Sequence, residues 1–112
     1  MSELPSLDPT LHQPVRTQIV AYLVGRQEAT FSELKRVLGM TDGNLDAHLK
    51  KLLAAEYLTQ RRETSGPRAQ TLFALSPRGL EALTCYTRQL QSLLALGATT
   101  PLPAGNAEPK PL

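Results

Sequence analysis

Apolar residues along this chain recur mainly at the three- and four-residue spacing of an amphipathic helix. The first such stretch starts at Pro14, because proline suits the first turn of a helix, where its missing amide costs nothing. Val15, Ile19 and Leu23 then fall on one face. The pattern predicts a helix over residues 14–24 that is buried through this face.

Two shorter amphipathic segments follow, joined by a turn at residues 39–41. Thr30 and Glu33 have the spacing of a capping box, in which each side chain binds a free amide at the start of a helix. Gly39 suits the left-handed backbone that often ends a helix, and Thr41 can cap the next one. The spacing predicts these buried positions: Leu34, Val37, Leu38, Leu45, Leu49, Leu52 and Leu53. Two helices joined by a tight turn that contains glycine form a helix-turn-helix, whose second helix can enter a DNA major groove.

Strand-favouring residues follow at 57–64 and 71–75, separated by the turn residues Ser65-Gly66-Pro67. Residues 29–31 can add a very short strand. The two longer strands predict a β-hairpin whose arms and tip carry basic and polar side chains: Arg61, Arg62, Arg68 and Gln70. A basic hairpin directly after a helix-turn-helix is a wing. The expected fold class is therefore mainly α with a small β-hairpin, a winged helix-turn-helix.

The last helix is predicted to start at Ser76-Pro77, an N-cap followed by proline. A seam with heptad-like spacing then runs along it through Leu80, Leu83, Thr87, Leu90 and Leu94. The small core leaves little for this helix to cover, so the seam can pair with the same helix of a second copy as a homodimer interface. The alternative is that the helix folds back onto the first helix and completes the core.

The length of 112 residues suits one domain and is too short for two. We expect a flexible N-terminal arm over residues 1–10 and a winged-helix domain over residues 11–96, with the dimerisation helix at 77–96. Residues 97–112 change to Pro, Ala, Thr and Gly, a composition that predicts a disordered tail.

The net charge of +2 does not by itself require a nucleic-acid partner. Basic residues are concentrated between residues 50 and 68, where only Glu56 and Glu63 oppose Lys50, Lys51, Arg61, Arg62 and Arg68. A locally basic face is typical of phosphate contact, although an ordinary solvated surface can show the same cluster.

Catalysis and metal binding are not expected from this sequence. It shows no nucleophile–base pair, paired carboxylates or Gly-rich phosphate loop, so we expect no enzyme activity and no cofactor. His12, His48 and Cys85 do not make a metal-binding set; His48 is expected to flank the core, and Cys85 to be a buried inert thiol rather than a redox switch. The single cysteine, with no membrane-spanning run and no signal peptide, favours a reducing cytoplasm and no membrane partner.

Five motifs follow one another along the chain: Phe31-Ser32-Glu33-Leu34, Leu38-Gly39-Met40-Thr41-Asp42-Gly43-Asn44-Leu45, His48-Leu49-Lys50-Lys51-Leu52, Tyr57-Leu58 and Phe73-Ala74-Leu75-Ser76-Pro77-Arg78-Gly79. In this order, within residues 15–94, they resemble the winged-helix DNA-binding family of MarR/ArsR-type transcriptional regulators, most closely its small single-domain subgroup. The resemblance implies a homodimer bound to a pseudo-palindromic operator, usually as a repressor. The sequence departs from it at Glu56, where such proteins often place glycine.

The second helix of the helix-turn-helix and the wing provide the predicted DNA contacts. The amide of Asn44 can bind an adenine edge, and Asp46 can accept from a cytosine amino group. Thr41 can hold a phosphate, and Gly43 allows close approach to the duplex. For Asp42 and Asp46 the alternative is helix capping and surface solvation. The full predicted DNA-binding set is Thr41, Asp42, Gly43, Asn44, Asp46, Ala47, Lys50, Lys51, Arg61, Arg62, Arg68 and Gln70.

Two functional classes are consistent with these features. The first is a sequence-specific, DNA-binding transcriptional regulator, with double-stranded DNA and a second copy of the chain as partners. The second is a protein-interaction module that binds a larger protein through its last helix and wing. The outward face of the helix after Thr41 distinguishes them, because Asn44, Lys50 and Lys51 favour DNA, whereas exposed apolar residues there would favour a protein partner.

Overall fold

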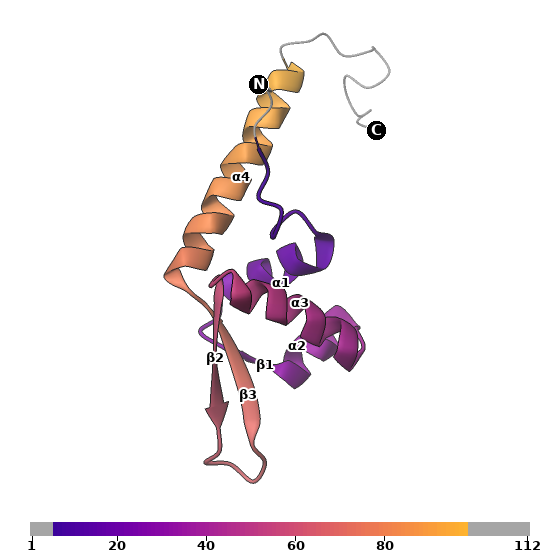
Figure 1. The fold of residues 1–112 in the computed structure, drawn as a ribbon, viewed down its shortest axis with the longest axis vertical. Helices are drawn as coiled ribbons and strands as arrows, with labels where there is room; N and C mark the ends of the chain where they lie inside the picture. The colour runs from indigo at the N-terminus through magenta and orange to yellow at the C-terminus, as the bar shows by residue number, and fades with distance from the viewer. Residues whose placement is uncertain (1–5, 99–112) are drawn as a thin grey trace, which may run out of the picture.

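The computed structural model describes residues 6–98. The first five residues of the predicted arm, and nearly all of the predicted tail, lie outside them. The elements, in chain order, are α1 (Pro14–Val24), β1 (Ala29–Thr30), α2 (Phe31–Leu38), α3 (Asp42–Ala54), β2 (Leu58–Glu63), β3 (Gln70–Leu75) and α4 (Pro77–Ala98). Figure 1 shows α1, α2 and α3 gathered above a narrow sheet, with the hairpin and α4 extending in opposite directions.

The helix ends follow from local chemistry, largely as predicted. The Thr30 hydroxyl accepts a hydrogen bond from the Glu33 amide at 2.9 Å, and Gly39 ends α2 at φ 65° and ψ 42°. The Thr41 hydroxyl accepts from the Asn44 amide at 3.2 Å and so caps α3. The second half of the capping box was wrong, because the Glu33 carboxylate is directed instead to the hydroxyl of Tyr22 on α1.

The core lies where the first three helices meet the sheet and the root of α4. Its fully buried members are Leu11, Ile19, Val20, Leu23, Ala29, Leu34, Leu45, Leu49 and Leu52. Leu38 and Leu53 pack against it and are partly buried, as expected. Val37 was wrongly placed in the buried set: its side chain is 44% exposed, because Leu34 and Leu38 take the inner positions of this short helix.

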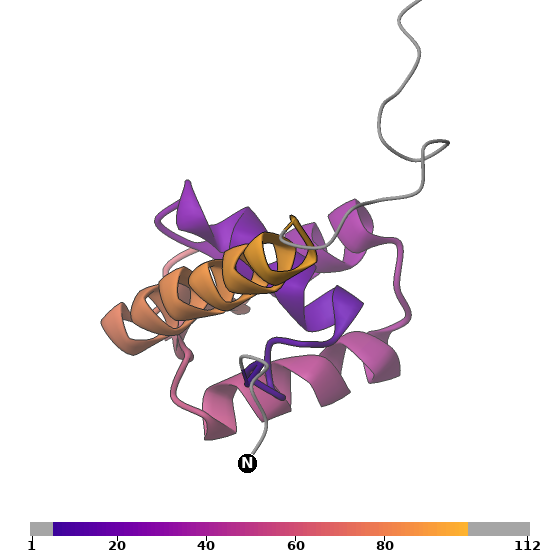
Figure 2. The same ribbon diagram turned by 90° about the horizontal axis from the view of Figure 1, so that it is seen from above.

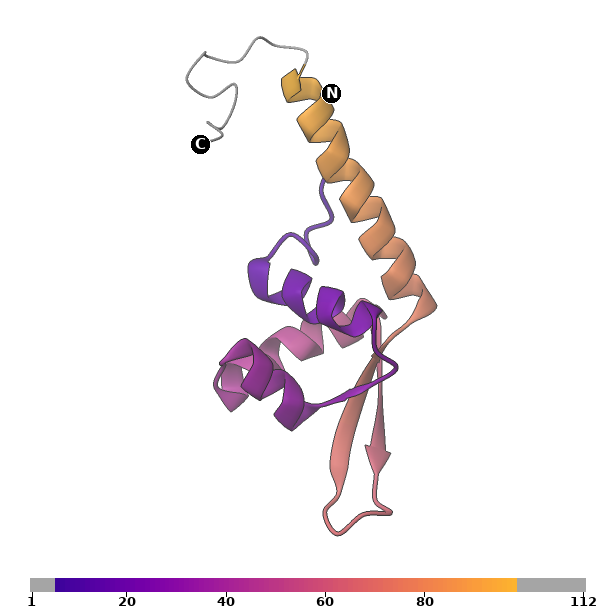
Figure 3. The ribbon, with the colours of Figure 1, turned by 180° about the vertical axis from the view of Figure 1, so that it is seen from behind.

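The sheet is antiparallel and has the order β1-β3-β2, so the short first strand pairs with the far arm of the hairpin. Neighbouring positions alternate between its two faces. Leu58 and Phe73 are buried on the face that carries the helices. Arg62 shares that face by alternation, whereas Arg61 pairs with Leu72 on the other face. The hairpin projects well beyond the helices (Figure 3).

The root of α4 is fixed against the turn that leaves α3. Glu56 has the left-handed φ of 65° at which the resembling family often has glycine. The Ser76 hydroxyl donates to the Glu56 carbonyl at 2.7 Å and accepts from the Gly79 amide at 2.9 Å. A Cβ at position 79 would lie 2.1 Å from the carbonyl oxygen of Tyr57. Only glycine therefore allows this approach, and the predicted N-cap at Ser76 is confirmed.

The segment before α1 connects the core to α4. Leu11 is fully buried, and one carboxylate oxygen of Asp8 accepts from the Thr10 amide at 2.8 Å. His12 Nδ1 lies 3.0 Å from the hydroxyl of Tyr86 on α4. Figure 2 shows α4 passing above α1. Of these contacts, only that of Asp8 with Thr10 lies within the predicted arm over residues 1–10, whose flexibility stays a prediction.

Candidate nucleic-acid interface

The outward side of α3 is a ridge of small residues between two polar flanks. Leu45, Leu49 and Leu52 bury the opposite side, so Gly43 and Ala47 form the exposed ridge. Helical spacing puts Asp42, Asp46 and Lys50 on one flank and Asn44, His48 and Lys51 on the other. The predicted residues of α3 are thus brought together on one exposed surface.

The two carboxylates of the first flank are already paired. Asp42 lies 2.9 Å from Lys35 of α2, and Asp46 lies 2.9 Å from Lys50 one turn along α3. Exposed pairs of this kind contribute about 0–1 kcal/mol, so a phosphate can compete for either lysine. The geometry fits the solvated-surface interpretation of these aspartates but not capping, because the Thr41 hydroxyl caps α3.

The arginines of the wing lie in different settings. Arg61, on the outer face of the sheet, donates to Glu28 at 2.8 Å and to Glu63 at 2.7 Å, and these two carboxylates raise its pKa. The Ser65 hydrogen bonds, followed by Arg61, lower the pKa of Glu63 to about 2. Arg62, on the helix side, donates to Thr71 at 2.7 Å. Arg61 is therefore separated from the α3 surface.

The remaining two predicted wing residues lie nearer the tip. Arg68 is exposed in the loop between β2 and β3, and Gln70 is exposed at the first position of β3. Arg62, Ala69 and Gln70 also line a shallow hollow with Thr30, Phe31 and Ser32, at the start of α2. The wing therefore borders the start of α2 on the helix side of the sheet, where Arg62 lies, while Gln70 pairs with Glu63 and falls on the outer face by alternation.

Sequence reasoning missed a basic group beside the second flank of α3. Arg16 of α1 places Nη1 3.3 Å from Nδ1 of the half-buried His48 and donates from Nε to the Thr10 carbonyl at 2.7 Å. Burial, then the charges of Arg16 and Lys51, lower the pKa of His48. His48 thus flanks the core as expected, but its contact is a guanidinium. Arg16 and His48 meet only through tertiary packing, so no local pattern indicates the pair.

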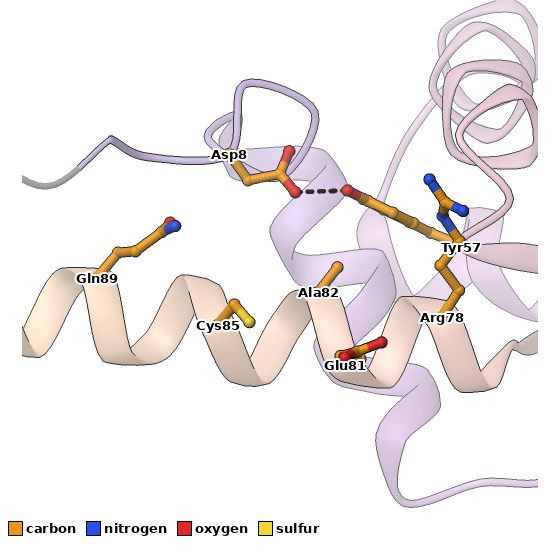
Figure 4. A pocket seen from close by; sticks show the side chains of 7 residues that line it. All are labelled: Asp8, Tyr57, Arg78, Glu81, Ala82, Cys85 and Gln89. Atoms are coloured by element: carbon orange, nitrogen blue, oxygen red, sulfur yellow. Dashed lines mark hydrogen bonds between the residues drawn. The ribbon is translucent and has the colours of Figure 1, made fainter.

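A separate cluster of polar side chains lines a pocket of about 330 Å³ at the root of α4 (Figure 4). The Tyr57 hydroxyl donates to Asp8 at 2.6 Å; this bond, followed by burial, raises the pKa of Tyr57 to about 12. Cys85 and Gln89 of α4 line the same pocket. Cys85 is exposed, so the expectation of a buried thiol was wrong. No group of three or more metal-ligating side chains occurs within residues 6–98.

The leucine seam of α4 divides between two environments. Leu83 is half-buried against the core and Tyr86 is buried, so this part of the helix does complete the core. Leu80, Leu90 and Leu94 are 50%, 36% and 74% exposed. The exposed Thr87 donates to the Leu83 carbonyl within the helix at 2.9 Å. Among the described helices, none is long and apolar enough to cross a membrane.

Comparison with known proteins gives consistent matches. A family model described as a winged helix DNA-binding domain matches residues 15–94. An uncharacterized protein of Methanocaldococcus jannaschii is 33% identical over 79 residues, 70% of this chain and 86% of that protein. A transcriptional regulator homologue from Pyrococcus horikoshii OT3 has a TM-score of 0.71 at 28% identity, covering 77% of this chain and 85% of that one. MepR of S. aureus, solved as a DNA complex, shares the fold, with a TM-score of 0.63 at 14% identity over 80% of this chain and 77% of its own.

Proposed function

This chain belongs to the winged helix DNA-binding domain family, as its resemblance to MarR/ArsR-type regulators predicted, and from that premise we propose that it regulates transcription as a homodimer bound to operator DNA. The observation that carries the proposal is the outward face of α3. The exposed large apolar residues among the described positions are Val24, Val37, Leu80, Leu90, Leu94 and Leu96. They lie on α1, α2 and α4, so the exposed side of α3 is left to small and polar residues that suit DNA better than an apolar protein partner.

We assign the contacts to DNA from this geometry. Gly43 and Ala47 let the backbone of α3 approach the floor of the major groove, where the exposed Asn44 can form a bidentate hydrogen bond to adenine. Thr41, at the start of α3, and Lys51 on its flank bind phosphates. Lys50 joins them by exchanging Asp46 for a phosphate. Asp42 and Asp46 then limit nonspecific binding.

The wing supplies contacts on the neighbouring backbone or minor groove. Arg68 is in the loop at the tip, and Arg62 lies on the face of the sheet that carries the helices, whereas Gln70, paired with Glu63, lies at the edge of the hairpin on the other face. Arg61 has a structural role in this proposal, because its guanidinium holds Glu28 and Glu63 on the outer face.

The dimer interface is proposed along α4. Leu80, Leu90 and Leu94 are exposed on adjoining parts of one face, with Leu83 at its edge and Thr87 between them. Burying each leucine stabilises the dimer by about 1.5–3 kcal/mol, so several together can outweigh the cost of association. Two α3 helices fixed about 34 Å apart can then read successive half-sites, and occupancy of a promoter would repress it.

Selection from a random-sequence duplex library tests this function. We expect purified protein to enrich a pseudo-palindromic sequence whose half-sites are about one helical turn apart. Asn44→Ala should weaken binding to the selected sequence by about 1–3 kcal/mol and to unrelated duplex much less. If the protein enriches no symmetric sequence, the operator proposal fails; if it also fails to bind duplex DNA, the protein-interaction reading takes its place.

A further inference from the structure

The two flanks of α3 differ in how their positive charges are balanced. On the first flank, Lys35 and Lys50 each contact a carboxylate at 2.9 Å. On the second flank, neither Arg16 nor Lys51 forms an ion pair with any residue that the structure describes. Arg16 is half-buried and Lys51 is exposed, so this flank presents two uncompensated cations.

Arg16 is held in place without being neutralised. Its Nε donates to the Thr10 carbonyl at 2.7 Å, and its Nη1 lies 3.3 Å from His48 Nδ1. A guanidinium has only donors, so Nδ1 must accept and the imidazole must be neutral in this contact. Two of the nitrogens of Arg16 are thus used for orientation, and its remaining N–H groups are available to an anion.

Position along α3 indicates which anion would reach this flank. His48 and Lys51 follow Asn44 by about one and two turns on the same side of the helix. A helix inserted in the major groove is bordered on both sides by the sugar-phosphate backbones. If Asn44 reads a base edge, the backbone on its own side must run beside His48, Lys51 and the Arg16 guanidinium.

We propose that Arg16 of α1, oriented by His48 and the Thr10 carbonyl, binds a DNA phosphate together with Lys51 on the Asn44 side of α3. This inference rests on the proposed DNA-binding function and adds to it a contact from outside the helix-turn-helix and the wing. His48 acts as a positioning residue, because it touches the arginine that binds the phosphate.

The contact that orients Arg16 depends on a neutral His48, because a protonated Nδ1 could not accept from the guanidinium. Burial, followed by the positive charges of Arg16 from α1 and Lys51 from α3, lowers the pKa of His48 below its ordinary value of 6.5 and so favours the neutral imidazole.

The test measures affinity for a random-sequence duplex of about 30 base pairs by fluorescence anisotropy over a range of salt concentrations. Arg16→Gln should lower the slope of log affinity against log salt by about one phosphate contact, whereas Arg16→Lys should keep the wild-type slope. Arg88→Gln, at an exposed position on α4, is the matched control for loss of an arginine charge and should leave the slope unchanged. His48→Ala, which removes the acceptor for Nη1, should lower affinity and the slope towards those of Arg16→Gln, whereas His48→Gln, whose amide oxygen can accept, should keep both.

Each outcome decides the inference. If Arg16→Gln keeps the wild-type slope while Arg68→Gln lowers it, DNA binding stands and the Arg16 site is overturned. If Arg16→Lys and Arg16→Gln lose affinity and thermal stability equally with unchanged slopes, the arginine only supports the fold, and the inference is again overturned. A wild-type protein that binds no duplex overturns the proposed function and this site together. Wild-type affinity and slope in His48→Ala remove the positioning role.

Discussion

Replacing Glu56 by glycine tests how much the left-handed turn after α3 costs the fold. At φ 65° the Cβ of Glu56 crowds the following carbonyl, which costs about 1–2 kcal/mol for a residue other than glycine. Glycine removes this cost but loses about 0.4–1 kcal/mol through the greater entropy of its unfolded chain. The net expectation is that Glu56→Gly gains about 0.5–1 kcal/mol in free energy of unfolding.

Glu56→Ala is the matched control. The Glu56 carboxylate lies 3.7 Å from Arg78 Nη1, and both side chains are largely exposed, so this ion pair contributes little. Alanine removes the ion pair as glycine does but keeps the Cβ, so the difference between the two variants isolates the backbone cost.

Urea unfolding followed by far-ultraviolet circular dichroism measures both variants and the wild type. All samples need the same protein concentration, because self-association would shift the apparent stability. For a domain of this size the difference corresponds to about 2–8 °C in Tm. If the glycine variant is no more stable than the alanine variant at equal m-values, the strain argument is refuted.

Three further predictions concern the contact between Gly79 and Tyr57, the leucine seam of α4 and the wing. Gly79→Ala should destabilise the fold by more than about 2 kcal/mol in chemical denaturation, because its Cβ would overlap the Tyr57 carbonyl, 2.1 Å away; a wild-type midpoint would contradict this. Leu90→Asp should yield folded monomers with weak operator affinity in sedimentation and anisotropy, because it puts a charge in the exposed seam; a variant that remains dimeric would refute the α4 interface. The pKa of Glu63 falls from 4.5 to about 2 on folding, so the stabilisation that its carboxylate gives is present above pH 4.5 and is lost as the pH falls towards 2. Glu63→Gln should therefore make the free energy of unfolding depend less on pH between 4.5 and 2. An unchanged dependence in this range would contradict the prediction.

Local signals predicted most of the fold, because each acts within a few residues. Thr30, Gly39, Thr41 and Ser76 cap or end helices where their side chains or backbone freedom require it. Val37 was misplaced because an eight-residue helix has room for only a narrow buried stripe.

The candidate site was less accessible to sequence reasoning, since it depends on which side of an element faces the duplex. Strand alternation from the apolar Leu58 carries a signal that would have separated Arg62 from Arg61, but the basic cluster was treated as one face. The partnership of Arg61 with Glu28 joins residues 33 positions apart, and that of Arg16 with His48 joins residues 32 apart. Periodicity cannot report such contacts, because they arise only when separate elements pack together.

The glycine at the base of α4 has a mechanical consequence for the proposed dimer. A helix of 22 residues is about 33 Å long, and the close contact between Gly79 and the Tyr57 carbonyl fixes its first turn. A small rotation of α4 about this contact therefore produces a larger displacement at its far end. A tilt of α4 by about 5° about this contact moves the C-terminal end of the helix by about 3 Å, which is comparable to the rise between two base pairs. Small changes in packing around the Gly79–Tyr57 contact would therefore change the distance between the two α3 helices of the dimer. That distance sets the length of operator that the dimer can span.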